Sequence, residues 1–383
     1  MLGKIQLQLG LQILLLAGLT ACGGAPSNVQ KPDSLGSFKQ ELSLKKLWSH
    51  SAGSMISTGG RIQLLLQNDS VISVSNAGTL TSFNRNTGKQ NWSTSLGVAI
   101  SAGIGGNESI LVVATRDGDI TAVSANDGTV RWTVNISGEV LSPPAPGGGK
   151  FILQTVDGRV MALSAQTGKT EWVYERTVPS LSLRGNSGPV YRQGLVVVGF
   201  ASGHVVGLDV RNGRAIWERV VAFPSGKSDV ERLVDIDSPP VISDSMLFAG
   251  SYQGKLVAID LRNGQTAWSR PLSVYLPMAS DGDVLFVVND QGVILAIDQK
   301  TGADKWAQND LKRRISSGPA ISSNAVVLGD IEGYIHLLNT NTGAVVGRYK
   351  SDSSRVTSNL AMDSKIYTST DSGQVQVYSI TTP

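Results

Sequence analysis

Apolar and polar residues alternate in short runs along most of the chain, and many of these runs end at a polar residue followed by glycine. The stretch 238–268 contains four such runs, which cover 239–242, 245–251, 255–260 and 265–268. Short runs of this period predict β-strands. The turn at Asn263-Gly264 allows the positive φ of a hairpin, and hairpins join antiparallel strands. The pattern therefore predicts a unit of four short antiparallel strands.

This unit recurs along the chain. Each copy opens on Gly, with a small residue four places later, a polar residue six later, Gly ten later and Trp fourteen later. Six copies keep this frame, at Gly78–Trp92, Gly118–Trp132, Gly158–Trp172, Gly203–Trp217, Gly254–Trp268 and Gly292–Trp306. A seventh copy, from Gly333, has Gly347 in place of Trp, and an eighth starts at Gly373. Most copies are about 40 residues apart, which is typical of repeat architectures. Eight units of four strands predict an all-β, eight-bladed β-propeller.

The tryptophans indicate how the ring closes. The chain has seven, namely Trp48, Trp92, Trp132, Trp172, Trp217, Trp268 and Trp306. We interpret them as structural residues that pack between blades, each ring N–H finding a partner. Trp48 precedes the first repeat, and the eighth repeat lacks its fourth strand. We therefore predict that residues 47–50 complete the blade begun by 356–380, giving a propeller domain of 45–383 without exposed sheet edges.

The small residue at the fourth position of each copy is expected to lie in mid-strand, where a neighbour packs closely. It is Ser82, Ala122, Ala162, Gly207, Ala258 or Ala296 in the six full copies.

The N-terminal residues predict export and lipid attachment. Lys4 followed by an apolar run at 13–19 is typical of a signal peptide, which we assign to residues 1–21. Leu19-Thr20-Ala21-Cys22 resembles the bacterial lipobox, and Cys22 is the only cysteine. The resemblance implies cleavage before Cys22 and acylation, for example with palmitate. Because Gly23 follows rather than Asp, it also implies attachment to the outer membrane, facing the periplasm. The polar residues 22–44 predict a flexible lipidated tether.

Composition and histidine placement narrow the function. Charged residues are 16% of the chain and the net charge is +3, so no large basic field indicates nucleic-acid binding. His50, His204 and His336 lie in different repeats without metal-ligand spacing. We therefore predict no metal site and no cofactor.

The repeat is interrupted at two consecutive places. The step from Gly158 to Gly203 is 45 residues and the step from Gly203 to Gly254 is 51. The extra residues form a first insert (179–185) and a second insert (223–239), each between the outer strand of one blade and the inner strand of the next. Such connections lie on one face of a propeller, where insertions commonly form a binding surface. We expect the inserts to lie side by side, next to the turns at Gly158, Gly203 and Gly254.

The inserts carry a specific resemblance. The sequences S-L-S-L-R-G at 180–185 and E-R-L-V-D-I-D-S-P-P at 231–240 resemble the BamB family, the propeller lipoproteins of the outer-membrane β-barrel assembly machinery, or Bam complex. The resemblance implies a non-catalytic scaffold that binds the periplasmic POTRA domains of BamA and other Bam subunits. It also implies assistance to β-barrel precursors. The positions that match the family's contact motif are Leu181, Leu183, Arg184, Asp235 and Asp237.

A structural role for these residues is an open alternative. The leucines could cover a blade while Arg184 pairs with Asp235 or Asp237 to brace the loops. For the two aspartates, bracing and direct partner contact are equally open. Changing Leu183 and Arg184 together to alanine is expected to weaken partner capture and leave the fold intact.

An enzymatic alternative comes from the repeat itself. Its A-x-D-x-x-T/N-G-x-x-x-W phrase also resembles the Trp-docking motif of quinoprotein dehydrogenases, which are eight-bladed and use pyrroloquinoline quinone with calcium. That resemblance implies vicinal cysteines and converging Glu, Asn and Asp ligands. No cysteine follows Cys22, and no spacing gathers such ligands. We therefore predict that the chain is not an enzyme.

Overall fold

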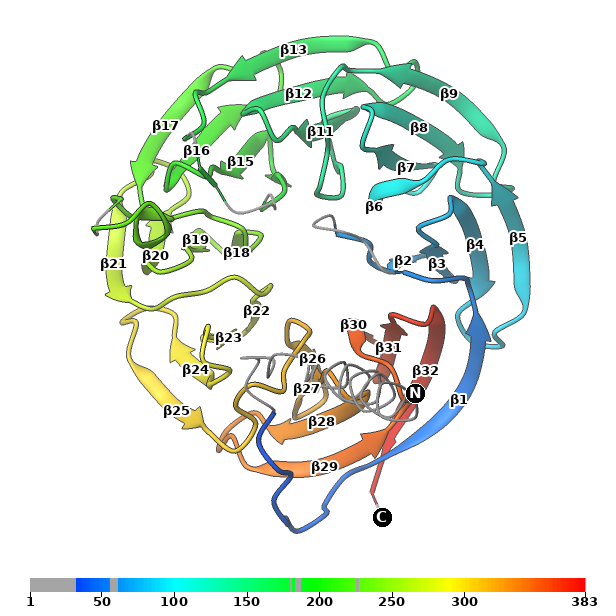
Figure 1. Cartoon of the computed structure of the whole chain (residues 1–383), viewed down its shortest axis with the longest axis vertical. Coiled ribbons are helices and arrows are strands. Elements are labelled where there is room, and N and C mark those ends of the chain that lie inside the picture. The colour runs from blue at the N-terminus through cyan, green and yellow to red at the C-terminus, as the bar shows by residue number, and fades with distance from the viewer. Residues whose placement is uncertain (1–31, 56–60, 180, 183–186, 225–226, 383) are drawn as a thin grey trace, which may run out of the picture. The chain divides into compact units, whose positions relative to one another are not determined.

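Eight four-stranded antiparallel sheets follow one another around a ring (Figure 1). The computed structural model describes residues 32–55, 61–179, 181–182, 187–224 and 227–382. Residues 33–383 form one compact unit, which contains every described strand. This arrangement confirms the eight-bladed propeller predicted from the repeat.

Seven blades are meanders of four consecutive strands. Blade one contains β2 (Leu65–Gln67), β3 (Ser70–Val74), β4 (Thr79–Asn84) and β5 (Gln90–Ser95), and blade two contains β6 (Ile100–Gly106), β7 (Ile110–Thr115), β8 (Asp119–Ser124) and β9 (Val130–Asn135). Blade three contains β10 (Ala145–Gly147), β11 (Lys150–Gln154), β12 (Arg159–Ser164) and β13 (Thr170–Glu175), and blade four contains β14 (Val190–Arg192), β15 (Leu195–Gly199), β16 (His204–Asp209) and β17 (Ala215–Val220).

The second half of the ring repeats this order. Blade five contains β18 (Val241–Ser243), β19 (Met246–Gly250), β20 (Lys255–Asp260) and β21 (Thr266–Pro271), and blade six contains β22 (Ala279–Asp281), β23 (Val284–Val288), β24 (Ile294–Asp298) and β25 (Asp304–Gln308). Blade seven contains β26 (Ala320–Ser322), β27 (Ala325–Gly329), β28 (Tyr334–Asn339) and β29 (Val345–Lys350). Blade eight contains β30 (Val356–Met362), β31 (Lys365–Thr370), β32 (Gln374–Thr381) and β1 (Ser43–Ser51). Helical structure among the described residues is the 3-10 turn η1 (Val230–Arg232), and no described helix is long and apolar enough to cross a membrane.

The N-terminal strand closes the ring as predicted. β1 pairs antiparallel with β32, from Ser43 opposite Thr381 to Ser51 opposite Gln374, and Figure 1 shows it along the outside of blade eight. Trp48 lies opposite Val377 in this ladder and is buried. Because β1 covers the outer edge of β32, the last blade gains the fourth strand that the eighth repeat lacks.

Each tryptophan joins its own blade to the next one. Every ring N–H donates to a main-chain oxygen of the following blade, as expected. The pairs are Trp48 with Arg85 (3.1 Å), Trp92 with Ala125 (3.0 Å), Trp132 with Ala165 (3.0 Å), Trp172 with Val210 (2.8 Å), Trp217 with Leu261 (3.1 Å), Trp268 with Gln299 (2.8 Å) and Trp306 with Thr340 (2.8 Å). The ring also packs on the second glycine of that blade. At Gly128, where φ is +72°, an added Cβ would lie 2.5 Å from the ring of Trp92, so both conformation and contact require glycine.

The small residue of the repeat faces this tryptophan across the third and fourth strands. Ala122 lies opposite Trp132, Ala162 opposite Trp172, and Gly207 opposite Trp217. An added Cβ on Gly207 would lie 2.4 Å from the Trp217 ring. Side-chain volume is therefore balanced across each strand pair, because a larger residue would collide with the indole.

The seventh copy reverses this balance. Leu337 is large where the other copies are small, and it lies opposite Gly347. In the other copies the tryptophan packs on the turn between strands three and four of the next blade. Blade eight takes its fourth strand from β1 and has no such turn, so a tryptophan at position 347 would have no turn to pack on. The main-chain N–H groups of Glu41 and Leu42 instead donate to the oxygen of Val346, at 2.8 Å and 2.9 Å. The missing tryptophan is thus a consequence of ring closure.

Residues 33–42, which the sequence pattern assigns to a tether, contact blade seven. Arg314 Nη1 donates to the main-chain oxygen of Asp33 at 2.6 Å, and Arg348 Nη1 donates to that of Gly36 at 3.1 Å. The Arg348 guanidinium also lies 4.8 Å from the ring centroid of Phe38, within the range of a cation–π contact. This part of the chain is therefore docked on the propeller.

Candidate partner-binding site

The first insert begins between the turns of blades three and four, as the repeat spacing predicts. The main-chain N–H of Arg176, just after β13, donates to the oxygen of Gly158 at 3.1 Å. The Arg176 side chain crosses to the next blade, where Nε donates to Ser202 Oγ at 3.1 Å. The segment that leads into the first insert is thereby fixed to the turns at Gly158 and Gly203.

The second insert lies against the next two turns. Just before the insert, the N–H of Val221 donates to the oxygen of Gly203 at 2.8 Å. Within the insert, Val234 Cγ2 would lie 3.1 Å from a Cβ added on Gly203. The N–H of Tyr252 donates to the oxygen of Asp235 at 2.9 Å. The second insert and the segment that leads into the first therefore lie on the face that carries the turns at 158, 203 and 254, which we call the insert face.

Two large apolar side chains of the inserts are exposed on this face. Leu181 is 47% exposed, and Phe223 is 74% exposed, more than any other large hydrophobic side chain among the described residues. Leu183 and Arg184 lie outside the described residues. Phe223 was not a predicted site residue, since a single aromatic in a polar loop has no periodic signal. An exposed phenylalanine at the start of an insertion is nevertheless unusual enough to mark an interaction site.

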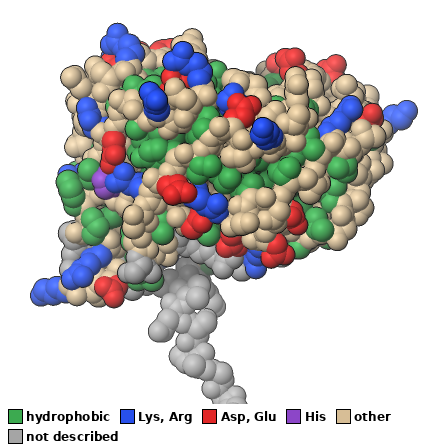
Figure 2. Space-filling view, turned by 90° about the horizontal axis from the view of Figure 1, so that it is seen from above, with side chains coloured by type: hydrophobic (Ala, Val, Ile, Leu, Met, Phe, Trp, Pro, Cys, Tyr) green, Lys and Arg blue, Asp and Glu red, His purple; other side chains and the backbone are tan. Residues whose placement is uncertain are grey.

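Charged side chains surround this part of the insert face. Arg176 Nη1 pairs with Glu218 at 2.8 Å, and Arg159 Nε pairs with Asp157 at 3.0 Å. They lie beside a hollow of about 380 Å³ that is lined by Asp157, Arg159, Glu175, Arg176 and Thr177. On the outer edge of the ring, which Figure 2 views from above the orientation of Figure 1, acidic and basic side chains are interspersed among hydrophobic ones. Apolar anchors within a rim of mixed charge are typical of a protein–protein interface.

The two aspartates of the motif, Asp235 and Asp237, are less exposed than Leu181. Asp235 is 1% exposed, and Asp237 is partly buried. Burial raises the pKa of Asp237 to about 7; the charge of Asp235 adds to this rise, and that of Arg61 opposes it. The Asp237 carboxyl group therefore interacts electrostatically with both Asp235 and Arg61.

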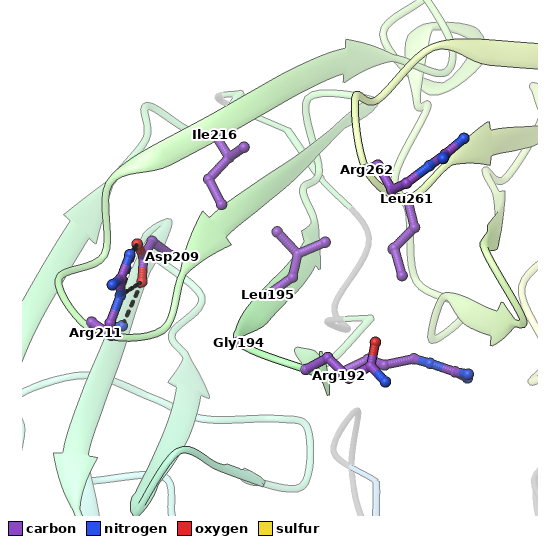
Figure 3. A pocket seen from close by; sticks show the side chains of 9 residues that line it. Arg192, Gly194, Leu195, Asp209, Arg211, Ile216, Leu261 and Arg262 are labelled. Carbon is purple, nitrogen blue, oxygen red and sulfur yellow. Dashed lines mark hydrogen bonds and ion pairs between the residues drawn. The ribbon is translucent and has the colours of Figure 1, made fainter.

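A second hollow lies at the opposite ends of blades four and five (Figure 3). It has a volume of about 410 Å³ and includes Leu195, Ile216 and Leu261. Its Arg211 and Arg262 each bind an aspartate of their own turn, with Nη2 2.6 Å from Asp209 Oδ2 and 2.8 Å from Asp260 Oδ2 respectively. These hydrogen bonds lower the pKa of both aspartates to about 2. Because their charges are already matched within each turn, these arginines are poorly placed to select a ligand.

The described residues also contain no group of three or more His, Cys, Asp or Glu side chains that could hold a metal ion. The two hollows contain no described histidine or cysteine. The feature of the described surface that points most directly to binding is therefore the insert face.

Comparison with known proteins places the chain in a family. The family model described as outer membrane protein assembly factor BamB matches residues 76–308 and 296–382. The outer membrane protein assembly factor BamB of Pseudomonas aeruginosa is 45% identical over 374 residues, which cover 96% of this chain and 98% of that protein. The crystal structure of BamB from Moraxella catarrhalis has a TM-score of 0.80 and 27% identity, and it covers 88% of this chain and 99% of that one.

The quinoprotein resemblance extends to the fold alone. A quinohemoprotein alcohol dehydrogenase from Comamonas testosteroni has a TM-score of 0.69 but 12% identity, over 88% of this chain and 76% of the dehydrogenase. A propeller hosts many unrelated functions, so this likeness carries no activity. The relatives that match in sequence over most of the chain are named as assembly factors, and the chain belongs to the BamB family of outer membrane protein assembly factors.

Proposed function

We propose that this chain is a non-catalytic scaffold of the Bam complex that uses its insert face to bind the periplasmic POTRA domains of BamA. In this role it also contacts other Bam subunits and assists the folding and insertion of β-barrel precursors. The observation that carries the proposal is the exposure of Leu181 and Phe223 on the insert face. Both lie in the inserts whose motifs resemble the family's contact sequence.

The chemistry of the insert face suits a macromolecular partner. Burial of an exposed phenylalanine and an exposed leucine supplies the apolar centre that protein interfaces commonly have. Leu183 and Arg184 extend the same motif and belong to the proposed site. We assign Asp235, which is 1% exposed, and the partly buried Asp237 to bracing, because neither presents a fully exposed side chain to a partner.

The double variant Leu181→Ala/Phe223→Ala is expected to lose about 10- to 100-fold in affinity for purified BamA POTRA domains, as expected for apolar hot-spot residues. Its melting temperature should stay close to that of the unaltered protein, because both side chains are already exposed. The affinity is measured by surface plasmon resonance with the POTRA domains immobilised.

Ile216→Ala is the matched control, since Ile216 is 55% exposed but lines the hollow away from the insert face. Unchanged affinity of the double variant, or an equal loss in the control, would refute the proposed site.

We also propose that the chain is anchored at the outer membrane through acylated Cys22 and faces the periplasm. Cys22 lies outside the described residues, and the proposal rests on the lipobox resemblance and on the name of the family. Cys22→Ala is expected to move the purified protein from the detergent phase to the aqueous phase in a detergent partition assay, because the acyl chains supply the apolar anchor. A variant that still enters the detergent phase would contradict the lipid anchor.

A further inference from the structure

Arg61 makes hydrogen bonds to blade two and to three of the connections between later blades. It precedes β2, the first strand of blade one. Its main-chain N–H donates to the oxygen of Leu141, between blades two and three, at 2.8 Å. Its own oxygen accepts from the N–H of Gly103 in β6 at 3.1 Å. The backbone of Arg61 is therefore held by blades on one side of the ring.

The side chain of Arg61 reaches the inserts on the other side. Nη2 donates to the main-chain oxygen of Asp237 at 3.1 Å, and Nη1 lies 3.5 Å from that of Ser187. Asp237 lies near the end of the second insert, and Ser187 follows the first. Ser187 is itself fixed to β15, since its Oγ accepts from the N–H of Gly199 at 3.2 Å. One guanidinium thus joins the downstream ends of both inserts.

The charges around this guanidinium make the contact specific. Burial lowers the pKa of Arg61 to about 10, and the charge of Asp237 opposes that shift. Asp237 in turn lies close enough to Asp235 for their charges to interact. Removal of this cation would leave the Asp237 carboxyl group without the charge that partly offsets its burial and its repulsion by Asp235. An arginine suits this position because its planar fork reaches two acceptors, whereas a lysine offers a single ammonium group.

We propose that Arg61 is a positioning residue for partner binding, which sets the two inserts relative to each other on the insert face. It acts through Ser187 and Asp237, 126 and 176 residues away in sequence. The inference rests on the proposed function of the insert face. Arg61 precedes blade one, whereas the surface that it would position follows blades three and four.

The first test measures the inserts without any partner. In the full-length Arg61→Met variant, hydrogen exchange is expected to rise about tenfold at amides of 176–182 and 221–237, because local opening becomes easier. Exchange in β7, β23 and β27 should stay unchanged. Arg61→Lys should give a smaller rise, since it keeps the charge but not the fork, and it remains informative if Arg61→Met folds poorly. Arg192→Met, on β14, is the control. An unchanged rate at both inserts, or an equal rise in all blades, would overturn the proposal.

The second test measures capture of purified BamA POTRA domains. Arg61→Met should weaken binding about tenfold, because the inserts lose the hydrogen bonds that hold their downstream ends together. Unchanged affinity for Arg61→Met, when Leu181→Ala/Phe223→Ala weakens binding, would overturn the role of Arg61 in capture. If the Leu181/Phe223 variant binds normally, the proposed partner site has failed, and the exchange experiment alone decides whether Arg61 positions the inserts.

Discussion

Deletion of residues 45–50 is expected to destabilise the whole ring rather than one blade. These residues form most of β1, the outer strand of blade eight. Without them β32 becomes an exposed edge, and blade one loses the indole of Trp48, whose ring centroid lies 5.9 Å from that of Phe83. Loss of a buried tryptophan alone costs about 3–5 kcal/mol. Because each blade is stabilised by its neighbours, opening one junction weakens every blade around the ring.

Differential scanning calorimetry of the full chain measures this effect. The deletion should lower the melting temperature by at least about 10 °C or abolish the cooperative transition, and Trp48→Ala should lower it by a smaller amount. Lys45→Ala/Lys46→Ala is the matched control, because both side chains lie on β1 but are exposed. A deletion variant with the same melting temperature as the unaltered protein would show that β1 does not close the ring.

The repeat phrase carried enough information to predict the ring and its closure. The turn glycines predict the hairpins, the strand periods predict the strands, and the displaced Trp48 predicts the strand that closes the ring. Each of these signals is local in the sequence. The repeat pattern does not explain why the seventh copy has the large Leu337 where the other copies have a small residue. The explanation is the cross-strand register, which places Leu337 opposite Gly347. Register is a property of strand pairs, which spacing along one strand does not contain. The absence of a tryptophan from the seventh copy is likewise explained by the structure. Blade eight takes its fourth strand from β1 and lacks the turn on which that tryptophan would pack.

The candidate site was predicted in part, for a similar reason. Insert lengths located the insert face, and the leucine motif marked Leu181, which is exposed. The burial of Asp235 could not be read from sequence, because it depends on contacts between segments far apart in the chain, such as the hydrogen bond from Arg61 to the main-chain oxygen of Asp237. Phe223 was missed because exposure of a loop aromatic is decided by packing and not by pattern.

Blade seven contains a buried ionic cluster that no sequence signal indicated. Asp330 Oδ2 lies 3.0 Å from His336 Nε2 and 3.1 Å from Arg314 Nη2. Its Oδ1 accepts from the N–H groups of Glu332 and Tyr334, at 2.9 Å and 2.8 Å. Burial alone would raise the pKa of Asp330, but these partners outweigh it and hold the pKa below its ordinary value. The carboxylate therefore stays ionised in the interior.

His336 fits this cluster as a neutral ring. Burial, together with the charges of Arg348 and Arg314, lowers its pKa more than Asp330 raises it. In the neutral form Nε2–H donates to Asp330, and Nδ1 accepts from Arg348 Nε at 3.4 Å. Arg348 and Arg314 also hold Gly36 and Asp33. The cluster thus connects the interior of blade seven to the docked segment 33–42.

Asp330→Ala is expected to cost about 3–5 kcal/mol in the free energy of unfolding, because it leaves the buried guanidinium of Arg314 and the His336 N–H without this acceptor. It should also loosen segment 33–42, since Arg314 is the donor to Asp33. Urea denaturation measures the first effect, and limited proteolysis of residues 33–42 measures the second. Asp371→Ala is the matched control, because Asp371 pairs at 3.0 Å with Arg355, whose side chain is 49% exposed, and such surface pairs contribute about 0–1 kcal/mol. If both variants lose the same stability and segment 33–42 stays protected, the cluster neither stabilises blade seven nor holds the segment.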